Sequence, residues 1–357
     1  MAPISSDARE NLRAALIILA LAIVVRVAFV FLVGLDSGPL YLAEVERVSK
    51  NLVTQQVFGN PYALRTGPTA HLAPVYPWLV SRLFRLFGTG SLGTLSVTLF
   101  NAVCASAQYA LLVVLALACG LSPRVGILAG AVGALFPLHP RVEVRGWEAS
   151  FVGMCWVAVL AFTIYWWRCH CGSGLYAALV GFCWGLLILA APQMLVVFVA
   201  VMTLYFLVVP QGTLGRTSIA MAAAALAILP WMIRNEKTFH QLFFIRSNFG
   251  LELSMSNHDD ANPLFVKEMY AAGARNFFQR RHPGLSLQEA QLVQRMGEVN
   301  YHHWRFEEAR QWIKTVSAQR TPSCERFLRT AKLRHDQTYK EGMDEVAKVD
   351  PRTCTKR

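Results

Sequence analysis

The sequence predicts an all-α, multi-pass membrane protein, on the strength of its composition and of the length of its apolar blocks. Of its 357 residues, 54% are hydrophobic and only 16% are charged. Its mean hydropathy of +0.38 is well above that of an ordinary soluble domain. Several blocks approach the roughly 20 apolar residues that a helix needs to cross a bilayer.

The first block, Ala14 to Gly34, predicts a retained membrane helix, since a signal peptide would have a shorter core and a small-residue cleavage site. Further blocks bring the expected total to about seven spans: Leu92–Cys119, Val125–Leu138, Ala149–Trp167, Leu175–Ala190, Met194–Val209 and Ile219–Ile233. Short linkers that carry Arg without a carboxylate are typical of cytoplasmic loops. The N-terminus is therefore expected inside, and the chain after Ile233 outside.

Two features fall between or within the expected spans. Val75–Phe87 is too short and too charged to cross, and its Trp, Leu and Phe beside two Arg predict an amphipathic helix in the membrane interface. Arg26 lies inside the first span, where an ionisable group is costly. We expect it either to have a partner within the bundle or to contact a lipid phosphate.

The domain organisation follows from changes in composition. Residues 1–233 are expected to form the transmembrane module, with residues 35–90 as a large first extracytoplasmic loop. Apolar residues at helical spacing in Leu285–Met296 and Tyr301–Ile313 predict a small helical extracytoplasmic region over residues 234–320. Residues 321–357 are polar and are expected to be a disordered tail.

Polar groups from distant segments fall on the predicted outer side of the membrane. Glu44 and Glu46 follow the first span, and the loop Thr66–Pro77 holds His71 and Tyr76. Glu148 falls on the same side. Loops that converge on one face often form a site. The competing interpretations are a solvated juxtamembrane helix, a structural Glu46 beside Arg47, and a Tyr76 that only fixes a turn.

Several other functions are not expected. The eight cysteines predict no disulfide framework, and Cys169-His170-Cys171 offers only three candidate ligands, so it is interpreted as a loop rather than a metal site. The net charge of +12 comes without a nucleic-acid-binding motif, so membrane lipids and lipid phosphates are the expected anionic partners. No phosphate-binding loop for ATP is present.

The order of these pieces resembles the GT-C superfamily of membrane glycosyltransferases, which includes protein O-mannosyltransferases and the lipid A aminoarabinose transferase. The closest resemblance is to bacterial proteins with a "glycosyltransferase RgtA/B/C/D-like" domain. It covers about residues 10–315. The segments that carry it are Glu44–Ser49, Gly59–Tyr62, Thr66–Pro77, Ala134–Pro137, Trp147-Glu148, Leu229–Asn235 and Arg246–Leu253.

This resemblance implies an inverting enzyme that moves a sugar from a polyprenyl phosphate to an acceptor hydroxyl on a glycan, lipid or protein. The bacterial inner membrane would hold it, with the site facing the periplasm. Glu44 is the expected base, with Glu46 and Glu148 as rivals. The other residues expected to bind substrate are Arg65, Arg234 and Arg246 for the phosphate, and His71, Tyr76, Asn248 and Glu252 for the sugar or acceptor.

No resident cofactor is expected, although a divalent metal stays open. Two departures from the superfamily matter: the first loop has no Asp beside Glu44 and Glu46, and the chain ends in a polar tail where relatives continue into further spans. The second departure predicts a truncated C-terminus. The alternative functions are a flippase or transporter of a lipid-linked substrate, and a non-catalytic membrane scaffold.

Overall fold

A computed structural model describes residues 6–33, 43–169, 172–208, 213–258 and 280–319. The regular structure of these residues is helical, and they contain no strand apart from one isolated bridge between Gly59 and Pro68. The expected all-α class is therefore confirmed. The predicted tail over residues 321–357, and His170 and Cys171 of the Cys-His-Cys triplet, lie outside the described residues.

The chain divides into two compact units, and each is considered by itself. The first comprises Met1–Pro61 and Gly67–Arg246, and the second comprises Tyr62–Thr66 and Ser247–Arg357. The division thus falls at 246/247, further along the chain than the expected boundary at 233/234, and it moves a short piece of the first loop to the second unit. The helices of the first unit are α1 (Ser6–Val33), α2 (Ala43–Thr54), α3 (Val75–Phe87), α4 (Ser91–Ala118), α5 (Pro123–Leu135), α6 (His139–Glu143), α7 (Ala149–Cys169), α8 (Gly174–Ala190), α9 (Met194–Val208) and α10 (Thr213–Phe239).

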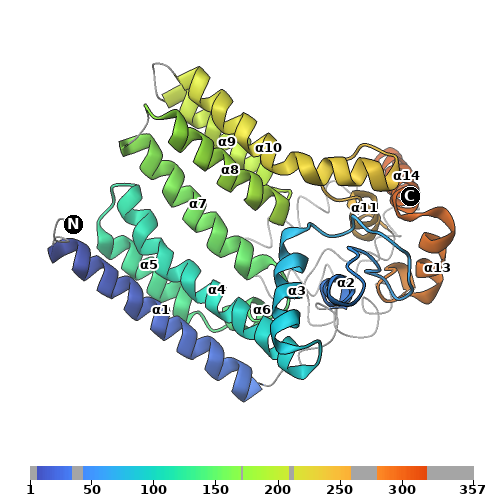
Figure 1. The fold of residues 1–357 in the computed structure, drawn as a ribbon, viewed down its shortest axis with the longest axis horizontal. Coiled ribbons are helices and arrows are strands. Elements are labelled where there is room, and N and C mark those ends of the chain that lie inside the picture. The colour runs from blue at the N-terminus through green and yellow to red at the C-terminus, as the bar shows by residue number, and fades with distance from the viewer. Residues whose placement is uncertain (1–5, 34–42, 170–171, 209–212, 259–279, 320–357) are drawn as a thin grey trace. The chain divides into compact units, whose positions relative to one another are not determined.

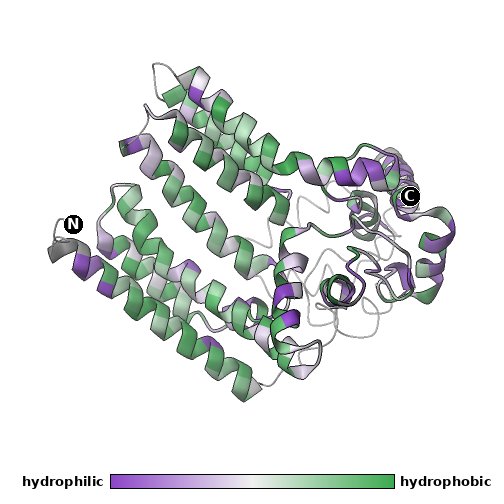
Figure 2. Ribbon diagram, in the orientation of Figure 1, coloured by the Kyte–Doolittle hydropathy of each residue, from purple (hydrophilic) through white to green (hydrophobic). Residues whose placement is uncertain are grey.

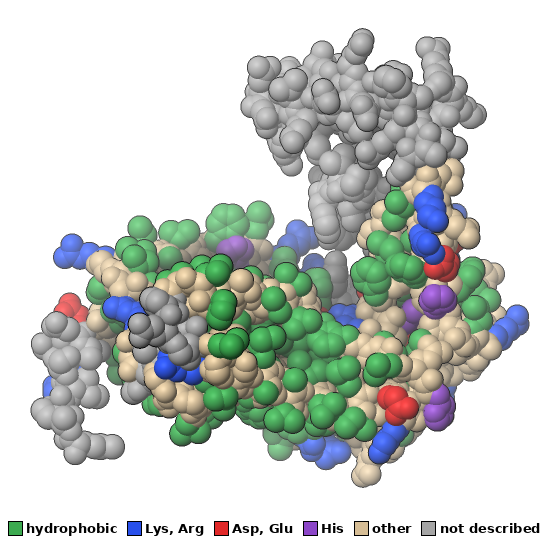
Figure 3. Space-filling model, turned by 90° about the horizontal axis from the view of Figure 1, so that it is seen from above, with side chains coloured by type: hydrophobic (Ala, Val, Ile, Leu, Met, Phe, Trp, Pro, Cys, Tyr) green, Lys and Arg blue, Asp and Glu red, His purple; other side chains and the backbone are tan. Residues whose placement is uncertain are grey.

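Four of these helices are long and apolar enough to cross a membrane, in the segments Arg9–Leu32, Ser91–Ala118, Ala149–Cys169 and Leu214–Phe239. Apolar residues dominate them in Figure 2, and in Figure 3 apolar side chains spread over much of the visible surface of the bundle. The other expected spans form shorter apolar helices, α5, α8 and α9, of 13, 17 and 15 residues. At about 1.5 Å per residue these are shorter than a hydrocarbon core of roughly 30 Å. The count of seven spans stays a prediction.

Helices α5 and α10 end at other residues than the apolar blocks that predicted them. Helix α5 ends at Leu135 rather than Leu138, because the backbone turns to an extended conformation at Phe136, just before Pro137. Helix α10 passes Ile233 and continues to Phe239, with Pro230 inside it. Its last turns are held by the backbone oxygen of Ile245, which accepts hydrogen bonds from Trp231 at 3.0 Å and from Asn235 at 3.2 Å.

Small residues allow α8 and α10 to pack at close range. A Cβ atom on Gly181 would lie 2.0 Å from the backbone oxygen of Ala220, and one on Gly185 would lie 2.7 Å from that of Ala224. Two glycines four residues apart, facing alanines, are a common interface between membrane helices because they bring the backbones together. This pair of helices anchors the largest buried apolar cluster of the bundle.

Arg26 of α1 has its partner inside the bundle. Its side chain is fully buried, and its guanidinium lies 2.7 Å from Glu143 of α6. It also donates to the backbone oxygen of Ala134 at 2.9 Å, near the C-terminus of α5. Tyr109 of α4 donates to the same Glu143 carboxylate. One ion pair thereby joins four helices, and of the two expectations for Arg26 the bundle partner is the one observed.

The first loop contains two helices, α2 and α3, which lie at one end of the spanning helices. Helix α3 has the bounds expected for the amphipathic segment, and it packs against α2 through a buried apolar cluster that includes Val45, Val48 and Val80. The loop between them is closed where Gly59 meets Gly67, since a Cβ on Gly59 would lie 2.4 Å from the Gly67 oxygen. Figure 1 shows α2, α3 and α6 at one end of the spanning helices.

The second unit contains α11 (Phe249–Ser256), α13 (Leu287–Met296) and α14 (Glu298–Gln319). Both segments with helical spacing are therefore helices, as expected. The core of this unit includes Leu251, which is fully buried. It also includes Tyr62, whose hydroxyl is hydrogen-bonded to His302 at 3.1 Å.

Candidate active site

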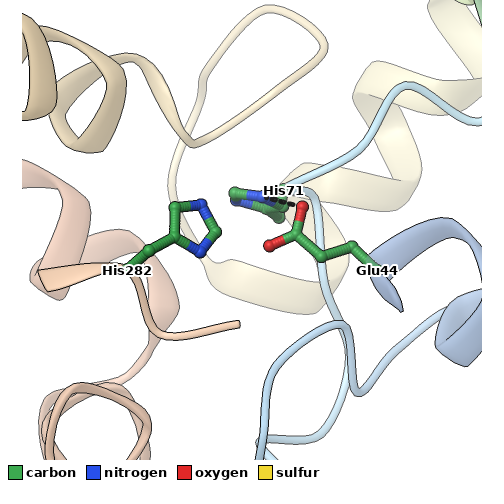
Figure 4. A group of neighbouring side chains, drawn as sticks. All are labelled: Glu44, His71 and His282. Carbon is green, nitrogen blue, oxygen red and sulfur yellow. Dashed lines mark hydrogen bonds and ion pairs between the residues drawn. The ribbon is translucent and has the colours of Figure 1, made fainter. Parts of the chain in front are cut away.

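Glu44 and His71 form a hydrogen-bonded pair in the first unit. The Nε2 atom of His71 lies 2.9 Å from the Oε2 atom of Glu44, as Figure 4 shows. His71 is 1% exposed and Glu44 is 21% exposed. A buried imidazole that contacts one carboxylate oxygen fixes the orientation of that carboxylate. The Glu44 carboxylate is therefore held in a defined geometry.

The loop around His71 is held by two Arg side chains that donate to its backbone oxygens. One Arg lies in α10 and the other lies in the segment after α10. Arg246 donates from Nε to the backbone oxygen of His71 at 2.8 Å. Arg234 donates to the backbone oxygen of Thr69 at 2.8 Å and to that of Phe58 at 3.1 Å. Its guanidinium also lies over the ring of Trp231, 4.8 Å from the centroid. Arg234 thus serves to hold the first loop against α10.

Arg246 keeps donors for a further partner. Besides the bond to His71, its guanidinium makes no hydrogen bond or ion pair with any other residue that the structure describes. It is close enough to Glu148 to stabilise the charged form of that carboxylate. Two terminal nitrogens on a planar guanidinium match the geometry of a phosphate group. The terminal nitrogens of Arg234 bond to the first loop, so Arg246 is the better phosphate ligand of the two.

Glu148 lies just before α7 and interacts with both charged neighbours. Burial raises the pKa of this carboxyl, Arg246 opposes the shift, and the charge of Glu44 adds to it. The net direction is upward, so Glu148 holds its proton at a higher pH than an exposed glutamate does. The hydrogen bond with His71 orients Glu44, and this contact favours Glu44 as the base.

Tyr76 and Asn101 connect the first loop to the segment that carries Glu148. The hydroxyl of Tyr76, 1% exposed, donates to Asn101 of α4 at 3.0 Å. The Asn101 amide in turn donates to the backbone oxygens of Arg145 and Trp147. Burial raises the pKa of Tyr76 above its usual range, so the phenol stays protonated. Tyr76 is thus a buried residue whose hydroxyl links α3 to α4.

Asn101 was not among the residues expected from the sequence. Its signal was present, because an amide inside an apolar span needs hydrogen-bond partners and tends to mark a packed or functional position. Glu143 was missed for a different reason. It lies 117 residues from Arg26 along the chain, and no local pattern relates the two.

The remaining expected site residues have local partners or lie in the second unit. Glu46 pairs with Lys50 one turn further along α2, at 2.5 Å. Arg65, Asn248 and Glu252 belong to the second unit. There, the Asn248 amide donates to the Glu252 carboxylate at 2.8 Å.

His282, also drawn in Figure 4, belongs to the second unit as well, where its ring accepts a hydrogen bond from the Gly284 backbone.

The chemistry of this site suits an acceptor proton and a phosphate. Glu44 and His71 offer a carboxylate oxygen and an imidazole nitrogen, but among the described residues of the first unit no third such ligand completes a metal cluster with them. What the first unit does bring together is an oriented carboxylate, a second carboxyl with a raised pKa, and a guanidinium. The described residues thus define a helical protein with helices long and apolar enough to cross a membrane and a polar site at the end of its bundle.

No protein-family model, no curated protein and no solved structure matches this chain. A functional assignment therefore has to rest on the residues of the site and their geometry.

Proposed function

We propose that this protein is a membrane glycosyltransferase. It moves a sugar from a polyprenyl phosphate to an acceptor hydroxyl, at the outer face of a bacterial inner membrane. The observation that carries the proposal is the pairing of Glu44 with the buried His71, beside Glu148 and Arg246. The apolar bundle suits a donor whose lipid part stays in the membrane.

In this reaction Glu44 accepts the proton of the acceptor hydroxyl as its oxygen bonds to the anomeric carbon. The bond from that carbon to the phosphate oxygen breaks, and the electron pair leaves with the polyprenyl phosphate. Attack opposite the leaving group inverts the anomeric centre. His71 keeps Glu44 in position, and Arg246 stabilises the charge that grows on the phosphate.

The proposal is tested with the full-length protein in nanodiscs and liposomes. Synthetic polyprenyl-phosphate hexoses and pentoses are supplied with glycan or lipid acceptors, and release of polyprenyl phosphate is followed by chromatography. A glycosyltransferase consumes at least one donor. A flippase moves labelled donor across the liposome membrane without consuming it, and a scaffold does neither, so either outcome overturns the proposal.

Arg246→Ala is expected to weaken donor binding by about ten- to a hundred-fold, because one charge-assisted contact contributes about 1.5–3 kcal/mol. Arg246→Lys should recover part of this through charge, but not the bidentate geometry. Titration with sugar-free polyprenyl phosphate measures the phosphate contact separately from the sugar.

The matched control is Arg124→Ala, which removes an exposed Arg from the start of α5. Unchanged affinity for polyprenyl phosphate in both Arg246 variants would remove the phosphate role. A loss of turnover alone would then mean that Arg246 acts only by holding the His71 backbone.

Glu148→Gln is expected to keep the transfer rate that the native protein has below the pKa of Glu148, and to lose the decline that follows as the pH rises through that pKa. The physical reason is the raised pKa of Glu148: below it the side chain is neutral and resembles glutamine, and above it a second negative charge appears beside Glu44. The measurement is kcat/KM against pH for both proteins. A decline at high pH that is the same in the variant would show that Glu148 does not control it.

A further inference from the structure

Helix α3 has two different faces, and only one of them is covered by protein. Tyr76, Pro77, Val80, Ser81 and Phe84 point into the first unit and are buried. Within the same helix, Trp78, Arg82, Arg85 and Leu86 are exposed. Their spacing of four, three and one residues puts them on one stripe of the helix surface.

The exposed stripe combines apolar and cationic side chains. Trp78 is 48% exposed and Leu86 is 75% exposed. Between them the guanidinium of Arg82 lies over the Trp78 ring, 4.5 Å from its centroid. Arg85 makes a single long hydrogen bond, 3.4 Å, to the backbone oxygen of Leu52. No carboxylate of the described residues pairs with either Arg.

The position of α3 relates this stripe to the membrane surface. A tight turn joins α3 to α4, and a Cβ on Gly93 would lie 2.0 Å from the Gly88 oxygen in that turn. Helix α3 therefore lies at the end of a helix long enough to cross the bilayer, and Figure 1 shows it running across the bundle rather than along it. A helix in that position lies at the depth of lipid headgroups.

We propose that the stripe formed by Trp78, Arg82, Arg85 and Leu86 binds anionic phospholipids of the adjacent leaflet. The indole and Leu86 enter the boundary between headgroups and acyl chains, where amphipathic side chains are favoured. The two guanidinium groups contact the lipid phosphates and select a net negative headgroup. This inference does not depend on the proposed sugar transfer.

The experiment uses the full-length protein in a neutral detergent. Binding of phosphatidylglycerol and of phosphatidylcholine is measured by native mass spectrometry and by titration at low and high salt. The native protein should prefer phosphatidylglycerol, and Arg82→Gln with Arg85→Gln should reduce that preference by about twenty-five-fold, or about fivefold for each charge. Trp78→Ala should weaken binding of both lipids alike.

The matched control removes two Arg from the polar second unit, Arg295→Gln with Arg310→Gln, and should leave the preference unchanged. Circular dichroism and size-exclusion chromatography verify that each variant is folded. Inorganic phosphate at millimolar concentration should not displace the lipid, since the stripe also binds its apolar part. An unchanged preference in the folded α3 variant, or full displacement by phosphate, would overturn the proposal.

Discussion

Glu44→Gln is expected to abolish sugar transfer while the protein stays folded and inserted in the membrane. Glutamine preserves the shape of the side chain and can still contact His71, but it cannot take a proton from an acceptor. The loss of a general base lowers kcat by roughly 10²–10⁴-fold. Release of polyprenyl phosphate under saturating donor measures this, and donor affinity should change little.

Glu46→Gln is the natural control for this experiment. It lies two residues away on α2, and its carboxylate is already paired with Lys50 at 2.5 Å. We expect near-normal turnover, because the change only breaks a partly exposed ion pair that contributes little. If Glu44→Gln retained normal turnover at matched protein levels, the base would have to be another carboxylate.

Arg26→Met is expected to lower the free energy of unfolding by about 3–5 kcal/mol, the cost of leaving one member of a buried ion pair uncompensated. The remaining Glu143 side chain is 15% exposed and would lose its cationic partner inside the bundle. The oxygen of Ala134 at the end of α5 would also lose its donor. Thermal unfolding in detergent, followed by circular dichroism, measures the effect.

The double variant Arg26→Met with Glu143→Gln shows whether the ion pair is the cause. Removing both charges should recover a large part of the loss, since no uncompensated charge remains. If the double variant were as unstable as the sum of the two single variants, the pair would not be coupled. The loss would then come from packing alone.

The helices were predictable because they depend on local composition. Each apolar block predicts a helix from its length and hydropathy alone, and α8 and α9 begin or end within a residue of the expected bounds. The amphipathic spacing of Val75–Phe87 likewise predicted α3 with its observed bounds. The differences at α5 and α10 concern helix ends, where a proline or a distant backbone acceptor decides how far the helix extends.

The candidate site was only partly predictable. The sequence indicated Glu44, His71, Glu148 and Arg246 as polar residues of neighbouring loops, but not which of them touch. The 2.9 Å contact of Glu44 with His71 spans 27 residues, and the contact of Arg246 with the His71 backbone spans 175. The hydrogen bonds that connect Tyr76 through Asn101 to the backbone just before Glu148 could not be predicted from the sequence either.

By itself, the sequence determined the helical class, the apolar segments, the two-faced α3 and the set of polar residues available for chemistry. Only the tertiary structure decided that Arg26 pairs with Glu143 and that His71 orients Glu44. It also decided that Arg234 holds the first loop. Among the described residues, Arg246 bonds only to the His71 backbone and so has N–H donors left for a ligand. The physical reason is range. Hydropathy and helical periodicity act over a few turns, whereas a buried polar group selects its partner from whatever side chains the packed helices bring within about 3 Å.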